Sequence, residues 1–168
     1  MGTREQKDPV TLADSGSRTY QYRIDSDGLW FCEGNPVTDE HLLSILSGSL
    51  FYRGKELFLR CEGEVHPVLP DDAPLVVRSL DITEDGTGEP AAVTLILNDG
   101  RHSSILPDTL TISHANVLYC LSTPKKFRTR FSKQAYYHLT RYLKQDPTTG
   151  DFFFLIHGRV HIIRQEES

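Results

Sequence analysis

The residues best suited to chemistry in this chain are cationic side chains near its C-terminus. Residues 125–144 include no acidic residue and seven basic ones: Lys125, Lys126, Arg128, Arg130, Lys133, Arg141 and Lys144. The rest of the chain holds all 23 acidic residues and 11 of the 18 basic ones, so a local charge of +7 stands against −12 elsewhere. Because an anion responds to local potential more than to net charge, this basic segment predicts an anion-binding surface.

The basic segment has the periodicity of an amphipathic helix. At about 100° per residue, one half of the circumference is apolar and expected to be buried; it holds Phe127, Phe131, Ala135, Tyr136, Leu139, Tyr142 and Leu143. The other half is a basic stripe of Lys126, Arg130, Lys133, Tyr137, Arg141 and Lys144. Phosphate or carboxylate groups along this stripe could meet several donors, and arginine adds bidentate geometry. Alternatively, the acidic remainder of the chain neutralises the stripe within the fold.

Two further residues allow two interpretations each. Arg128 projects among the apolar residues of the predicted helix. Either the helix begins after Arg128, or its guanidinium reaches an acid or a ligand between the two halves of the protein. Trp30 ends a predicted strand, where it is either a core residue or an aromatic at the seam between the halves that stacks on a base.

Histidine and aspartate pairs give weaker signals. His157 and His161 have a metal-like spacing, but they flank a predicted turn at Gly158, where packing histidines are the alternative. Asp71 and Asp72 could do acid–base chemistry or cap a turn before a proline. The phosphate-loop, dinucleotide-loop, zinc-protease and nucleophile-elbow motifs are all missing from the sequence. The sequence therefore favours a binding protein over an enzyme and predicts no metal and no cofactor.

The elements that must position these residues form an α+β pattern in two small packed halves, each with mainly antiparallel strands and one helix. Residues 1–18 are expected to be a flexible tail, 19–88 the N-terminal half and 89–168 the C-terminal half. A helix from about Thr38 to Ser47, with Thr38 as its N-cap, and a linker at 83–90 are also predicted. Strands or hairpins are predicted at 21–32, 50–52, 57–61, 65–69, 75–82, 92–97, 101–105, 109–112, 117–121, 151–156 and 159–163.

Bulk properties exclude several classes of protein. The formal net charge of −5 argues against a general nucleic-acid coat and against a protein of anionic membranes. No run approaches the roughly 18 apolar residues of a membrane span, and the polar start lacks a secretory signal, so we expect a cytoplasmic protein. Cys32, Cys61 and Cys120 each lie in an apolar run and are expected to be reduced core thiols.

The sequence resembles the bacterial DUF1285 family of unknown function. The resemblance is carried by Ile24–Trp30, Gly34–Val37, Asp72–Pro74, Thr129–Lys133, Ala135–Leu139 and Gly158. Leu75 departs from it, since the family pattern has an aromatic residue there, and the C-terminal region is more basic than in the family. The resemblance implies a duplicated core, a C-terminal half similar to a pleckstrin-homology fold, a nucleotide-type ligand between the halves and a role in signalling. It supports Asp72, Arg130 and Lys133 as ligand contacts.

Together these observations predict a cytoplasmic module, without catalytic residues, that binds a small anionic ligand, nucleotide-like, between its halves. The predicted ligand-binding residues are Arg128, Arg130, Lys133, Tyr137, Asp72 and Trp30. An acidic protein partner docking on the basic helix is the alternative. A hydrolase that uses Asp71 or Asp72 with His157 or His161 ranks third. No membrane and no extended nucleic acid is expected as a partner.

Overall fold

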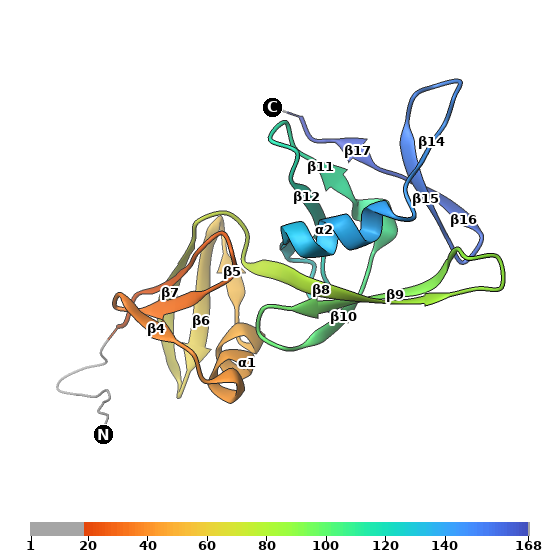
Figure 1. Cartoon of the computed structure of the whole chain (residues 1–168). Helices are drawn as coiled ribbons and strands as arrows, with labels where there is room; N and C mark the ends of the chain where they lie inside the picture. The colour runs from red at the N-terminus through yellow and green to blue at the C-terminus, as the bar shows by residue number, and fades with distance from the viewer. Residues whose placement is uncertain (1–18, 168) are drawn as a thin grey trace. The chain divides into compact units, whose positions relative to one another are not determined.

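The computed structural model describes residues 19–167, which form two units (Figure 1). Within these residues, unit 1 comprises 19–24 and Leu29–Asp71, and unit 2 comprises Asp25–Gly28 and 72–167. The predicted tail, residues 1–18, lies outside the described residues. From Asp72 onward the chain stays in unit 2, so the boundary after unit 1 lies at Asp72 and not near residue 88. The reason is that residues 75–97 form one hairpin and stay together.

Unit 1 is a six-stranded sheet with one helix. Its strand order is β4-β3-β2-β7-β6-β5, and all neighbours are antiparallel except β2 and β7. The strands are β2 (Tyr22–Ile24), β3 (Trp30–Cys32), β4 (Asn35–Val37), β5 (Phe51–Arg53), β6 (Glu56–Cys61) and β7 (Glu64–Pro70). The predicted first helix is confirmed as α1 (Glu40–Gly48). Its N-cap is Asp39 and not Thr38, because the Asp39 carboxylate accepts from the backbone N–H of Leu42 at 2.9 Å.

Unit 2 contains two sheets and one helix, so the predicted α+β class is confirmed. The larger sheet has the order β10-β9-β8-β13-β12-β11-β17, with parallel pairs β13/β8 and β11/β17, and the smaller has the order β14-β15-β16. The elements are β8 (Leu75–Glu84), β9 (Pro90–Leu97), β10 (His102–Ser104), the 3-10 turn η1 (Pro107–Thr109), β11 (Thr111–Ile112), β12 (Leu118–Leu121), β13 (Arg128–Phe131), α2 (Lys133–Thr140), β14 (Lys144–Gln145), β15 (Phe152–Ile156), β16 (Arg159–Ile162) and β17 (Arg164–Gln165).

The prediction of one long basic helix is wrong in its first part. Arg128–Phe131 form β13, in the middle of the larger sheet, and α2 begins only after Ser132. The Ser132 hydroxyl caps α2 by accepting from the backbone N–H of Ala135 at 3.1 Å. Within β13, Thr129 and Phe131 are buried while Arg128 and Arg130 are half-buried. This alternation has period two, so the backbone pairs with β8 and β12 instead of coiling.

The predicted linker at 83–90 is also wrong, because this stretch closes the hairpin of β8 and β9 (Figure 1). One carboxylate oxygen of Asp85 organises the turn. It accepts from the Thr87 backbone N–H at 2.7 Å, from the Thr87 hydroxyl at 2.6 Å and from the Glu89 backbone N–H at 3.2 Å. Asp85 thus forms an Asx turn, and the glycines and polar residues here mark a tight turn and not a flexible link.

The segment Asp25–Gly28 makes the tight turn predicted between β2 and β3. Gly28 donates its backbone N–H to the Asp25 carbonyl at 3.0 Å and has φ +88°. Asn98 holds this turn within unit 2: its amide donates to the Gly28 carbonyl at 2.8 Å and accepts from the Val76 backbone N–H at 3.1 Å. A Cβ on Gly28 would lie 2.8 Å from the Asn98 Cβ and 2.9 Å from the Val76 Cβ. Only glycine fits both the dihedral angle and the space.

Two other predictions can be compared with the described residues. The three cysteines are free, as expected, although only Cys120 is fully buried and Cys32 and Cys61 are half-buried. Between residues 19 and 167, no helix has both the length and the apolar character that a membrane span requires.

We expect Gly28→Ala to lower the free energy of unfolding by about 2 kcal/mol or more, because the new methyl group meets both φ strain and two close carbon atoms. Gly34→Ala is the matched control: Gly34 has φ +84° but no atom within 4 Å of an added Cβ. It should cost only the strain, about 1 kcal/mol. Urea denaturation of both variants makes the comparison, and equal losses would refute the packing argument.

We expect acid to weaken the β8–β9 turn through Asp85. Hydrogen bonds from the Thr87 hydroxyl, and then from backbone N–H groups, lower the pKa of Asp85 below its ordinary 3.8. A lowered pKa means that the carboxylate stabilises the fold above the ordinary pKa and loses this effect as pH falls through the lower, folded value. Thermal unfolding between pH 7 and about pH 3 should therefore show wild type above Asp85→Asn at neutral pH and the gap closing in acid. A constant gap contradicts this assignment.

Candidate functional site

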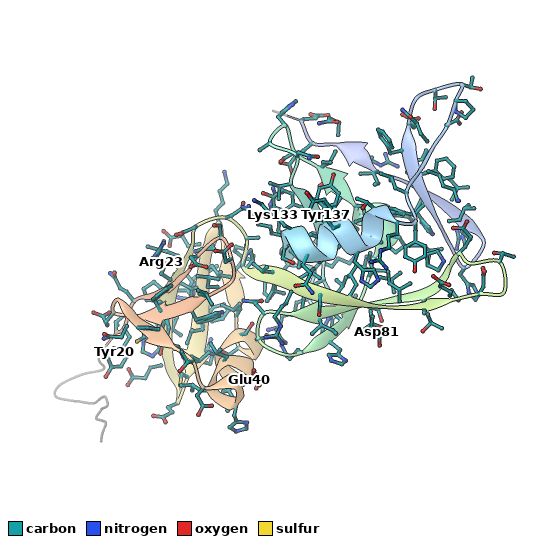
Figure 2. All side chains as sticks on the ribbon, in the orientation of Figure 1. Tyr20, Arg23, Glu40, Asp81, Lys133 and Tyr137 are labelled. Carbon is teal, nitrogen blue, oxygen red and sulfur yellow. The ribbon has the colours of Figure 1, made fainter. Side chains whose placement is uncertain are left out.

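The structure divides the six predicted ligand-binding residues into three groups. Asp72, Arg128 and Arg130 lie together in unit 2. Lys133 and Tyr137 lie one turn apart on α2, as Figure 2 shows. Trp30 is 2% exposed in the core of unit 1. The stripe that the helical periodicity predicted is therefore divided, because Arg130 lies in β13 whereas Lys133 and Tyr137 lie on α2.

Arg130 is held by the carboxylate of Asp72. Its Nη1 lies 2.7 Å from Asp72 Oδ2, and the same oxygen accepts from the Tyr119 hydroxyl at 2.7 Å. Tyr119 sits directly across from Arg130 in the pairing of β12 with β13. Burial first, and then the hydrogen bond to Asp72, raise the pKa of Tyr119, so its phenol keeps its proton and remains a donor. Asp72 thus fastens Arg130 and Tyr119 to each other.

Arg128 is the second guanidinium on the same side of β13. The guanidinium carbon Cζ of Arg128 lies 3.7 Å from the centroid of the Tyr119 ring, which is a close cation–π contact. Its Nη1 and Nη2 donate to the two oxygens of Glu166 at 2.8 and 3.3 Å. Burial alone would lower the pKa of Arg128, but the hydrogen bonds to Glu166 and Tyr119 outweigh it and raise the pKa. Of the two sequence alternatives for Arg128, the first is found, because the helix begins after it; the acid that it reaches, Glu166, belongs to unit 2 as Arg128 does.

Glu166 is positioned by the backbone and not by its side chain alone. It follows β17, which runs parallel to β11, and its N–H donates to the Ile112 carbonyl at 2.8 Å. This pairing places the Glu166 carboxylate next to Arg128, which lies 38 positions earlier in the sequence. Neither Glu166 nor Tyr119 was predicted as a site residue. No local pattern marks them, because only the order of strands in the sheet brings them to β13.

A pocket of about 350 Å³ opens beside Arg128 and Glu166. Its lining residues are Thr109, Thr111, Tyr119, Cys120, Leu121, Arg128 and Glu166. The Thr109 hydroxyl is occupied, since it donates to the Leu106 carbonyl at 2.6 Å and accepts from the Leu121 backbone N–H at 2.9 Å. The Thr111 hydroxyl has no hydrogen bond to any of residues 19–167. The pocket therefore combines a guanidinium, an available hydroxyl and apolar walls.

The remaining cations of the basic stripe are neutralised only in part. Lys144 pairs with Glu89 at 2.7 Å, as Arg130 pairs with Asp72. Lys126, Lys133 and Arg141 are not paired with any acid in the part of the chain that the structure describes. Lys133 and Arg141 flank α2, whose Tyr137 is 74% exposed. The stripe is thus divided between ion pairs inside unit 2 and a small cationic surface on α2.

The other candidate residues do not assemble into a catalytic group. His161 is buried, and its Nδ1 lies 2.6 Å from Oδ1 of Asp108, which is its acidic partner in place of Asp71 or Asp72. Asp71 pairs with Arg23 through two hydrogen bonds. His157 occupies the β15–β16 turn with φ +54°. The predicted hydrolase pairs are therefore not formed. Within residues 19–167, no group of three or more histidine, cysteine or acidic residues could hold a metal ion.

Trp30 is a core residue and not a stacking platform. Its ring meets Tyr22 edge-on, with centroids 6.1 Å apart and an interplanar angle of 66°. Its Nε1 is buried and has no acceptor among the described residues. Of the two sequence interpretations, the core position is the one found.

Comparison with known proteins identifies the fold. No family model and no curated protein matches the sequence. The crystal structure of a DUF1285 family protein from Silicibacter pomeroyi DSS-3 has a TM-score of 0.68 and 18% identity, over 87% of this chain and 80% of that one. A DUF1285 family protein from Shewanella baltica OS155 has a TM-score of 0.57 and 16% identity, over 71% of this chain and 90% of that one. The resemblance is confirmed at the level of the fold, whereas the duplicated core and the pleckstrin-homology likeness stay predictions.

We expect Asp72 and Arg130 to be energetically coupled by about 1–2 kcal/mol in a double-mutant cycle of alanine variants, because both side chains are largely shielded from water. The neighbouring pair, Asp71 with Arg23, is the matched control. Its side chains are 38% and 54% exposed, so its coupling should be smaller. Chemical denaturation of the single and double variants measures both couplings. Equal couplings would mean that the Asp72 pair is an ordinary surface contact.

Proposed function

We propose that this chain, which has the fold of the DUF1285 family proteins, is a binding module for a small anionic ligand. The ligand occupies the pocket beside Arg128, which lies wholly within unit 2. The observation that carries the proposal is a guanidinium stacked on Tyr119 at the wall of a pocket that also offers the Thr111 hydroxyl. The binding residues are therefore Arg128 and Thr111, with Tyr119 beneath the guanidinium.

Arg128 suits a phosphate or carboxylate group. Its side chain is 41% exposed, and a guanidinium has five N–H donors in one plane, of which Glu166 occupies two. The Tyr119 ring fixes that plane, so less conformational entropy is lost when an oxyanion binds two N–H groups at once. The Thr111 hydroxyl can donate a further hydrogen bond to the same oxyanion.

The Glu166 carboxylate lies where the oxyanion of a ligand would bind Arg128. Its ion pair with Arg128 is part-exposed, at 41% and 30% of the two side chains, and such pairs stabilise a protein by about 0–1 kcal/mol. A phosphate group carries more charge than a carboxylate and forms charge-assisted hydrogen bonds of about 1.5–3 kcal/mol each. A phosphorylated ligand can therefore displace the Glu166 side chain while its backbone stays bonded to Ile112.

The size and walls of the pocket indicate the ligand class. A volume of about 350 Å³ lies near the lower end of small-molecule sites. Leu121 supplies an apolar contact for a planar ring, while Arg128 takes the charge. A nucleotide with one or two phosphates fits this combination. Reversible binding of such a ligand is compatible with the signalling role that the resemblance implies, and free cysteines fit the reducing cytoplasm.

Asp72 and Arg130 act as positioning residues in this proposal. Asp72 is itself an anion, so it cannot attract one. Its carboxylate instead orients the Tyr119 phenol and thereby the ring on which Arg128 lies. Arg130 neutralises Asp72, which prevents the carboxylate from repelling the ligand.

The cationic surface of α2 carries the second candidate function, docking of an acidic protein. Lys133 and Arg141 are not paired with an acid among the described residues, and Tyr137 is 74% exposed between them. Exposed tyrosine and arginine side chains, such as Tyr137 and Arg141, are enriched at protein interfaces. Such docking would weaken strongly with salt, since exposed charges are screened.

Isothermal calorimetry with inorganic phosphate and a panel of adenosine and guanosine phosphates tests the first candidate. Arg128→Ala should weaken binding by about 10-fold or more, because it removes charge-assisted hydrogen bonds. Glu166→Gln should tighten binding by about 2- to 5-fold, because it removes the competing carboxylate but keeps the shape of the side chain.

Lys133→Ala is the control, because it removes one positive charge on α2 and none at the pocket. It should leave the dissociation constant within about 2-fold, since Lys133 does not line the pocket and an exposed charge is screened. Weaker binding by Glu166→Gln would overturn the displacement argument. Loss of binding with Lys133→Ala but not with Arg128→Ala would move the site to α2.

A further inference from the structure

A second cationic surface lies in unit 1, on the hairpin formed by β5 and β6. Leu57 and Leu59 of β6 are buried, whereas Phe58 and Arg60, which alternate with them, point to the opposite face of the sheet. The pairing of the strands places Phe51 beside Phe58 and Arg53 beside Glu56 on that same face. One face of the hairpin thus carries two phenylalanines and two arginines.

These four side chains are stacked on one another. The Phe51 and Phe58 rings have centroids 5.9 Å apart and are inclined by 29°. The Arg53 guanidinium lies 5.7 Å from the Phe51 centroid and 5.5 Å from the Phe58 centroid. The Arg60 guanidinium lies 5.2 Å from the Phe51 centroid. Two exposed guanidinium groups therefore lie over the Phe51 ring, and this contact restricts their orientation.

Arg23 of unit 1 also lies over a phenylalanine ring, but it has an acidic partner. Arg23 lies 5.4 Å from the Phe31 centroid and also binds the carboxylate of Asp71 through two hydrogen bonds. Neither Arg53 nor Arg60 forms an ion pair with any of residues 19–167. Even Glu56, across the hairpin from Arg53, forms no salt bridge with it. What distinguishes the hairpin is thus two stacked guanidinium groups without a carboxylate.

We propose that the β5–β6 hairpin docks an acidic segment of a partner protein, whose carboxylates bind Arg53 and Arg60 as Asp71 binds Arg23. Stacked guanidinium groups are preorganised for bidentate contact with carboxylates. On the same face of the sheet, Pro67 lies beside Phe58 and Leu69 is 65% exposed, which provides apolar contacts next to the charges. Arginine and aromatic side chains next to apolar ones are typical of interface hot spots.

A nucleic-acid strand fits this surface less well. Each of the two rings on which a base would stack already has a guanidinium group over it, and Glu56 lies beside Arg53. A strand with one phosphate per nucleotide also needs a longer basic groove than two arginines provide. An acidic peptide can place its carboxylates at the two arginines and its apolar side chains between them.

Fluorescence anisotropy of the full chain with a labelled decapeptide of alternating glutamate and leucine tests the proposal. Arg53→Gln/Arg60→Gln should weaken binding by about 10-fold or more, since two charge-assisted contacts are lost. Arg53→Lys/Arg60→Lys keeps both charges but loses the planar fork, and should weaken it by an intermediate factor. Thermal unfolding of each variant verifies that the fold is intact.

Arg159→Gln/Arg164→Gln is the matched control, because it removes two exposed positive charges from β16 and β17, outside the hairpin and outside the cationic surface of α2. It should change the affinity by less than about 2-fold if the contact is specific to the hairpin. The proposal is overturned if the peptide does not bind, if the control weakens binding as much as the hairpin variant does, or if a labelled ten-residue oligothymidylate binds more tightly than the peptide. None of these results depends on the pocket beside Arg128.

Discussion

The pairing of β13 between β8 and β12 is the constraint on which the candidate site depends. It holds Arg128 and Arg130 extended, so both guanidinium groups leave the same face of the strand while Thr129 and Phe131 enter the core. It also sets Tyr119 directly opposite Arg130 and diagonal to Arg128. A helix at these residues would have separated the two arginines by 200° and dispersed the network.

Both units contain an arginine that lies over an aromatic ring and pairs with a carboxylate, and the two cases differ in the surroundings of that carboxylate. Tyr119 supports Arg128, which has Glu166; Phe31 supports Arg23, which has Asp71. In the first case the carboxylate borders a pocket, whereas in the second it is part of an exposed surface. The local acid decides whether a stacked guanidinium is part of the fold or is available to a ligand, since an exposed pair is weak and exchangeable.

The sequence predicted the fold well where one strand could be recognised by itself. The apolar runs that became β6, β7, β9 and β15, and the capped helix α1, needed no knowledge of their neighbours. β4 was missed because Pro36 is a residue that strands tolerate only at edges, where β4 lies. Arg128–Phe131 was read as helix because four residues with a period of two fit within an apolar helical pattern, and only pairing with β8 and β12 decides between them.

The candidate site was less predictable for the same reason. Arg128, Arg130 and Asp72 were identified from charge and family resemblance, but their partners were not. Tyr119 and Glu166 reach them through strand pairing across long separations, which no local pattern encodes. Lys133 and Tyr137 were placed on one stripe with Arg130 because the helix was extended too far, and the family resemblance also supported Lys133.

The turn Asp25–Gly28 has a consequence for dissecting the protein. It is part of unit 2, although the residues on either side of it belong to unit 1. A fragment that began at Asp72 would retain every strand of the larger sheet and yet lack this turn. The Asn98 amide would then have no Gly28 carbonyl to bind, and the side of Val76 that now meets Gly28 would be open to water. Cutting the chain at one point therefore does not yield an intact unit 2, because its two segments are separated by most of unit 1.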